Sequence, residues 1–184
     1  MTSARLNFTQ YKWDIYAVGY KDAADILVNS LLDGKRLVDN LVYPIIFLYR
    51  HYIEIRLKEI TMSGNQLLNL TADFKDGHVL AEKWRDCREV IKKIFITDSK
   101  EHLNNFESLL FEYSKIDSGS DSFRYPVTTL RKNTNKRDAT LPGVKRIDVL
   151  HFKNVVGRMG NLLENISNAI GEFQNEQTKL EDVN

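Results

Sequence analysis

The chain has little cysteine, little proline and no long apolar run, and each shortage excludes a class of protein. Its 184 residues include one cysteine, so no internal disulfide can form, and no stretch has the paired Cys and His spacing of a zinc site. The longest apolar run covers residues 41–49, which is too short to cross a membrane. The first residues lack the apolar stretch of a secretion signal. We therefore expect a cytoplasmic protein that is neither secreted nor embedded in a membrane.

The single cysteine, Cys87, lies in a segment with helical spacing. Trp84, Cys87 and Ile91 fall on one stripe of a helix. Free cysteine behaves mostly as a small apolar residue in protein cores, so we interpret Cys87 as a packing residue rather than a reactive thiol. The chain also lacks a glycine-rich phosphate loop, a metal triad and the glycine-framed serine of hydrolases, so no cofactor or metal is expected.

Apolar residues recur at three- and four-residue steps over most of the chain, and no long region alternates with a period of two. Gly34 is a natural helix stop, Pro44 suits the first turn of a helix, and Asp148 is a good N-cap. A capping-box arrangement within residues 97–101 begins another helix. These signals predict five helices, at about residues 13–33, 44–62, 78–95, 100–116 and 149–173.

Residues 117–143 have a different character, with two prolines, clustered Ser, Gly and Asn, and only a short alternating stretch. We predict a long loop or a short β-hairpin there, inserted before the last helix. The fold class is therefore all-α, an antiparallel bundle of four to five helices. It forms a single domain over residues 1–184, with a core at about 13–176 and a frayed tail at 177–184.

Net charge first argues against a nucleic-acid partner, because 26 basic and 25 acidic residues leave only +1. The charge is unevenly distributed, however. Residues 1–123 hold 16 basic and 18 acidic residues (−2), residues 124–158 hold 9 and 2 (+7), and residues 159–184 hold 1 and 5 (−4). Near-neutrality excludes a protein that coats polyanions along its whole surface, but it leaves room for a local phosphate site.

The segment 124–158 forms a basic island, flanked by the aromatic residues Phe123 and Tyr125. Such a patch holds phosphates electrostatically while an aromatic ring stacks on an exposed base. The alternative is a solvated loop whose charges meet acidic helices of the same chain. The island consists of Arg124, Arg131, Lys132, Lys136, Arg137, Lys145, Arg146, Lys153 and Arg158.

The second predicted helix carries a polar stripe. Arg50, Glu54 and Lys58 are spaced four apart, so ion pairs are expected along one helix face. His51 and His78 are both possible bases, yet neither has a nucleophile at a spacing that sequence can place beside it. The spacing leaves open whether the stripe faces solvent, the core or a cleft.

Residues 49–60 read YRHYIEIRLKEI and residues 77–84 read GHVLAEKW. These two segments resemble the signature helices of HEPN-like helical domains. Residues 121–126, DSFRYP, are similar to a turn found in one mostly uncharacterised bacterial branch of that superfamily. The resemblance covers about residues 43–173.

This resemblance implies a four- or five-helix bundle that is usually a homodimer. It also implies a polar network that joins the second and third helices, either as a functional site or as ion pairing that specifies the fold. The network would contain Arg50, His51, Glu54, Lys58, His78 and Arg124.

Nucleolytic HEPN domains share an arginine followed by a histidine after four to six residues, and Arg146 and His151 have this spacing. The resemblance thus implies a metal-independent ribonuclease in which the histidine moves a proton and the arginine stabilises developing charge. The other interpretation is a non-catalytic module that binds RNA or a cognate protein, in phage defence or a toxin–antitoxin pair. A third is an interaction protein without nucleic acid.

Overall fold

The computed structural model describes residues 3–4, 12–34, 37–95, 100–128 and 136–181. These residues contain five helices. No named strand occurs in these ranges, so the all-α prediction is confirmed. The helices are α1 (Lys12–Leu32), α2 (Val38–Leu67), α3 (Leu80–Ile94), α4 (Lys100–Ile116) and α5 (Val149–Glu181).

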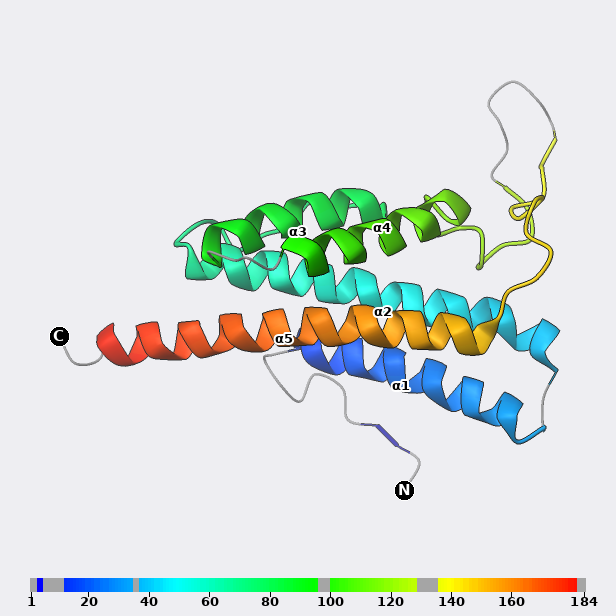
Figure 1. The fold of residues 1–184 in the computed structure, drawn as a ribbon, viewed down its shortest axis with the longest axis horizontal. Helices are drawn as coiled ribbons and strands as arrows, with labels where there is room; N and C mark the ends of the chain where they lie inside the picture. The colour runs from blue at the N-terminus through cyan, green and yellow to red at the C-terminus, as the bar shows by residue number, and fades with distance from the viewer. Residues whose placement is uncertain (1–2, 5–11, 35–36, 96–99, 129–135, 182–184) are drawn as a thin grey trace.

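Helix α2 is the centre of the bundle. It packs against α1 and α5 on one side and α3 on the other, and α4 packs against α3 (Figure 1). Asp25 of α1 accepts a hydrogen bond from Tyr49, and Asp14, earlier in α1, pairs with Arg56, later in α2. Helix α1 is therefore antiparallel to α2, as predicted.

The prediction of a wholly antiparallel bundle is wrong, because α2, α3 and α5 run in the same direction. Tyr52 of α2 donates a hydrogen bond to Glu164 of α5 over 2.8 Å, and Gln174 of α5 donates to the carbonyl of Ser63 over 3.0 Å. Residue numbers thus rise together along α2 and α5.

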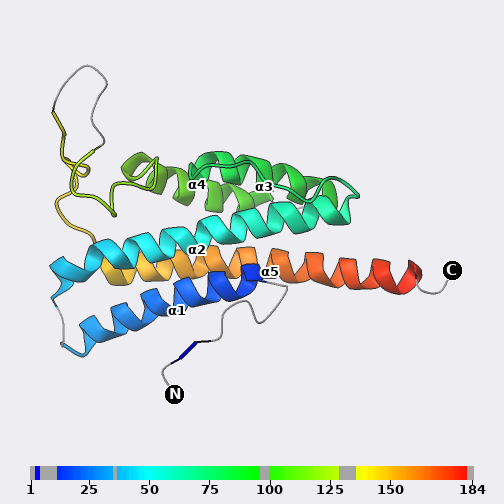
Figure 2. The same cartoon turned by 180° about the vertical axis from the view of Figure 1, so that it is seen from behind.

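A return segment, residues 68–79, explains the parallel direction of α2 and α3. It runs back along the bundle, as seen from behind in Figure 2, so that α3 starts beside the middle of α2. The ammonium group of Lys83 fixes this segment by donating to the carbonyls of Lys75 and Asp76. The sequence showed this segment as an ordinary loop and gave no sign of its direction.

Helix α2 is longer at both ends than predicted. It begins at Val38, so Pro44 lies inside it. Because proline has no N–H, the carbonyl of Asn40, four residues earlier, lacks its helical hydrogen bond. Asn40 is exposed and near the first turn of the helix. It also continues through Gly64, which is buried because α3 packs closely against it. A β-carbon added to Gly64 would lie only 2.9 Å from Ile94 Cδ1 of α3. The helix ends before Asn69, whose φ of 55° is the left-handed C-terminal stop.

The described parts of the insertion before α5, residues 117–128 and 136–148, contain one antiparallel bridge, between Val127 and Ala139. They lie at one end of the bundle (Figure 1). The predicted cap at residues 97–99 and the loop residues 129–135 fall outside the described ranges. Helix α5 begins after Asp148, whose Oδ1 accepts the His151 N–H over 2.9 Å, which confirms the predicted N-cap. Residues 177–181, predicted to fray, are helical.

The core forms where α2 meets its neighbours, around Trp84, Tyr52 and Leu57. Cys87 is 0% exposed there, and burial raises the pKa of its thiol to about 12. A thiol in this state stays protonated at neutral pH, which agrees with its interpretation as a packing residue. Among the described residues, no helix is long and apolar enough to span a membrane.

Candidate nucleic-acid interface

The polar stripe on α2 is buried. The side chains of Arg50 and Glu54 are 0% and 1% exposed, and Arg50 Nη1 donates to Glu54 Oε2 over 2.6 Å. Lys58 Nζ lies 2.8 Å from Glu54 Oε1. The ion pairs expected from the four-residue spacing are therefore present, and they lie inside the bundle.

His78 completes the pairing of Glu54. Gly77, with a φ of 96°, turns the chain so that His78 Nδ1 lies 2.8 Å from Glu54 Oε1, while the His78 carbonyl accepts a bond from Arg50 Nη2. Burial alone would raise the pKa of Glu54, but hydrogen bonds from Lys58, Arg50 and His78 lower it to about 2. The carboxylate is thus charged, and the Nδ1–H of His78 donates to it.

Asp117, at the end of α4, is a member of the network that sequence reasoning missed. The carboxylate is 1% exposed, with Oδ2 3.5 Å from Arg50 Nε and Oδ1 accepting the Ser122 N–H over 3.1 Å. Asp117 therefore joins the buried network to the turn at residues 120–126.

Arg124 and His51, two predicted members of the network, make other contacts. Arg124 donates to Asp121 Oδ1 over 2.7 Å and to the carbonyl of Ser120, and its guanidinium lies over the rings of Phe47 and Tyr125. The half-buried His51 ring stacks with Phe47, and burial lowers its pKa. Asp117, rather than Arg124, connects the turn to Arg50, because only its carboxylate complements a buried guanidinium.

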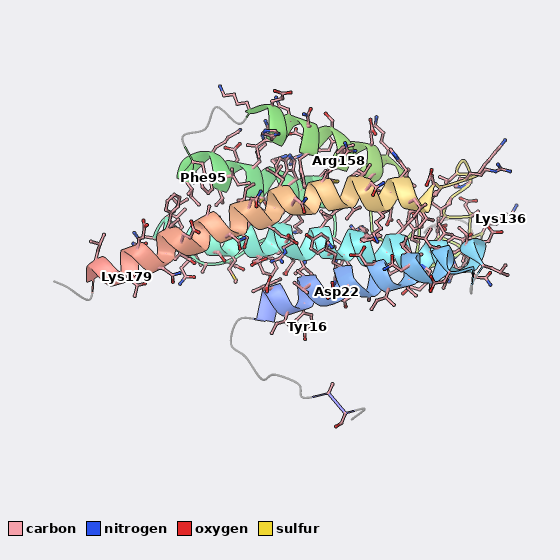
Figure 3. The ribbon with its side chains drawn as sticks, turned by 60° about the horizontal axis from the view of Figure 1, so that its bottom comes forward. Tyr16, Asp22, Phe95, Lys136, Arg158 and Lys179 are labelled. Atoms are coloured by element: carbon pink, nitrogen blue, oxygen red, sulfur yellow. The ribbon has the colours of Figure 1, made fainter. Side chains whose placement is uncertain are left out.

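Some cations of the basic island already have partners within the protein. Lys153 Nζ lies 3.4 Å from Asp25 Oδ1 and 3.3 Å from Asn29 Oδ1, so it is used within the fold. Arg131 and Lys132 fall outside the described residues. Arg124, which pairs with Asp121, and Arg137, whose Nη1 donates to the Thr128 carbonyl over 3.2 Å, are exposed but also used within the fold. The other exposed members are Lys136, Lys145, Arg146 and Arg158. Figure 3 shows Lys136 at the end of the bundle that carries the loop, whereas Arg158 lies farther along α5.

Only one of the two predicted aromatic residues is available for stacking. Phe123 is 5% exposed and stacks on Tyr113, with ring centroids 6.3 Å apart, so this ring is not available to a base. Tyr125 is 55% exposed. Sequence reasoning missed a second exposed ring, Tyr43, which is 49% exposed and lines the same hollow as Tyr125. Tyr43 was hidden in the sequence by the apolar run around it.

Arg146 and His151 lie on either side of the α5 N-cap, and both are exposed. Both line a hollow of about 310 Å³ between α4 and α5, whose floor is formed by α2. Because Arg146 precedes the helix and His151 is in its first turn, the Asp148 cap fixes the backbone between them. The two side chains therefore line the same hollow from opposite sides of the N-cap.

No group of three His, Cys, Asp or Glu side chains suited to a metal ion occurs within the described part of the chain. Comparisons with protein-family models, with curated proteins and with solved structures found no match.

Proposed function

We propose that this protein is an RNA-binding helical module of the HEPN-like type. The observation that carries the proposal is the gathering of exposed Lys136, Arg137, Lys145 and Arg146 with the exposed Tyr125 at one end of the bundle. Cations neutralise phosphates without reading sequence, and an exposed ring stacks on an unpaired base. Lys58 and the exposed His78 converge on the buried pair Arg50–Glu54, and this convergence supports the HEPN-like resemblance and a role of the pair in specifying the fold.

The biological setting is part of the same proposal. A module of this type would act as a homodimer in a bacterial defence or toxin–antitoxin system, with RNA or a cognate protein as its partner. An interaction protein that does not bind nucleic acid is the competing outcome, and RNA binding distinguishes the two.

RNA binding can be tested with a charge-reversed pair. In Lys145→Glu/Arg146→Glu, affinity for a fluorescein-labelled RNA should fall at least tenfold in fluorescence anisotropy, and the plot of log affinity against log salt should become flatter by about 1–2 units. The matched control is Lys92→Glu/Lys93→Glu, which makes the same charge change on the exposed surface of α3. Absence of salt-dependent binding by the wild type, or an equal loss in both pairs, would contradict the proposal.

A second candidate function, a metal-independent endoribonuclease, is favoured by the shared hollow of Arg146 and His151. In this reaction the RNA 2′-hydroxyl attacks the adjacent phosphorus and the bond to the 5′-oxygen breaks. His151 would accept the proton of the attacking hydroxyl, and Arg146 would stabilise the added negative charge on the phosphate oxygens. The leaving 5′-oxygen would take a proton from water, so the products would be a 2′,3′-cyclic phosphate and a free 5′-hydroxyl.

The nuclease candidate predicts cleavage of total RNA in the presence of a chelator. We expect His151→Ala to remove this cleavage and His102→Ala, an exposed histidine on α4, to retain it. RNA with 2′-O-methyl groups should stay intact, because the attacking hydroxyl is blocked. If the wild type cleaves nothing, or if His151→Ala cleaves equally well, the nuclease candidate fails and the binding module stands.

A further inference from the structure

Three hollows at the loop end of the bundle are joined by shared lining residues. The first, about 360 Å³, is lined by Tyr43, Arg124 and Tyr125 among others. It shares Tyr43, Phe123 and Leu141 with the second, of about 520 Å³. The second shares Arg146 and Ile147 with the third, the 310 Å³ hollow between α4 and α5. We call this succession the three-hollow track.

The chemistry of the lining changes along the track. The first two hollows present the exposed rings of Tyr125 and Tyr43 and the cations Lys145 and Arg146, together with Arg124, which is paired with Asp121. Among the described residues that line them, Asp39 is the one acid. These hollows therefore suit a chain that carries negative charges and flat rings in alternation.

The third hollow is mostly apolar. Its acidic lining residues are Asp148, which caps α5, and the exposed Glu112. A phosphate fits this hollow only beside the exposed Arg146 and His151, because elsewhere the apolar lining and Glu112 make it unfavourable, whereas the faces of a base are apolar. The apolar lining consists of Ile53, Leu80, Leu109, Leu110, Val155 and Met159, with others.

Arg50 contributes a buried charged group to the wall of the third hollow. It is 2% exposed, and its guanidinium is paired with Glu54 over 2.6 Å and with Asp117, whose Oδ2 lies 3.5 Å from Nε. Because both carboxylates compensate this charge inside the protein, the hollow does not need a phosphate there, and its apolar lining remains to contact a base.

We propose that one strand of unpaired RNA lies along the three-hollow track and that one of its bases occupies the hollow between α4 and α5. The proposal rests on the RNA binding proposed above. A duplex does not fit the same chemistry, because its bases are stacked on one another and present no faces to Tyr43, Tyr125 or the apolar hollow. The phosphates of the strand would follow Lys145 and Arg146, because Arg124 is already paired with Asp121.

Binding of short labelled oligoribonucleotides tests the proposal. Affinity should rise with strand length until all three hollows are filled, and a blunt duplex of the same length should bind at least tenfold more weakly. Tyr125→Ala should weaken strand binding about tenfold, since one stacked base contributes on that order. Tyr16→Ala is the matched control, because Tyr16 on α1 is also 55% exposed and lines none of the three hollows.

Filling the third hollow gives an independent measurement. Val155→Trp should weaken strand binding at least tenfold, and Ile147→Trp, in the loop before α5, does the same without altering a helix. Thermal melting identifies a variant that fails to fold. The proposed track is overturned if strand and duplex bind equally, if Tyr125→Ala binds as the wild type does, or if both filled variants do. The proposed function would still hold in that case, provided that RNA binding depends on salt. A dimer that both filled variants dissociate would show that a second copy occupies the hollow.

Discussion

Glu54→Gln is expected to lower the free energy of unfolding by about 3–5 kcal/mol, because it removes one partner from a buried set of charges. Glu54 is bonded to Arg50, Lys58 and His78, and both carboxylate oxygens are used. The amide keeps the shape but not the charge, so Arg50 loses a strong acceptor inside the bundle. Its other charged partner, Asp117 at 3.5 Å, is too distant to replace a 2.6 Å bond.

Urea denaturation followed by far-UV circular dichroism measures this loss. The control is Glu172→Gln, the same change at an exposed position of α5, which should alter stability by no more than about 0.5 kcal/mol. The pH dependence gives a second readout. Because the pKa of Glu54 is lowered from 4.5 to about 2, its contribution is complete above pH 4.5 and is lost as the pH falls through 2. The difference between wild type and variant should shrink over that interval, and a pH-independent difference would contradict the role given to its charge.

Gly64→Ala is expected to destabilise the bundle by about 1–3 kcal/mol, although alanine is the better helix former. The added β-carbon would collide with Val90 Cγ1 and lie 2.9 Å from Ile94 Cδ1. Val90 is β-branched and buried in α3, so its side chain cannot turn away without disturbing the helix contact.

A glycine at an uncrowded helix position provides a control that should change stability in the opposite direction. Gly19→Ala, within α1, has no heavy atom within 4 Å of the added carbon, so it should stabilise the protein by about 0.5–1 kcal/mol. Thermal melting of the two variants should therefore move in opposite directions. A gain in both would mean that α2 and α3 separate readily at Gly64.

Sequence reasoning located helices well where local signals agree. The bounds of α1 and α4 and the start of α5 match their predicted positions to within a few residues, because an amphipathic stripe coincides there with a stop or cap such as Gly34 or Asp148. Helix α2 was predicted too short, since Gly64 and Pro44 are helix breakers in isolation. The packing of α3 against Gly64 keeps this part of α2 helical, and that contact is not visible in a single sequence.

The same distinction applies to the candidate site. The spacing of Arg50, Glu54 and Lys58 was visible because the residues lie on one helix turn after another. The role of Asp117 was not visible, because this buried carboxylate lies far from Arg50 in the sequence and forms no local pattern with it. Phe123 and Tyr125 looked equivalent in the sequence, yet packing on Tyr113 buries the first and leaves the second exposed.

The length of α5 has a practical consequence for handling the molecule. Its 33 residues extend for about 50 Å, and Figure 3 shows Lys179 and Lys136 at opposite ends of the molecule. Cys87 is the single native cysteine and is fully buried, so Lys179→Cys would introduce the one readily accessible thiol. A sensor surface or fluorophore coupled there would hold the protein by the end away from the loop, with its cations and tyrosines facing the solution.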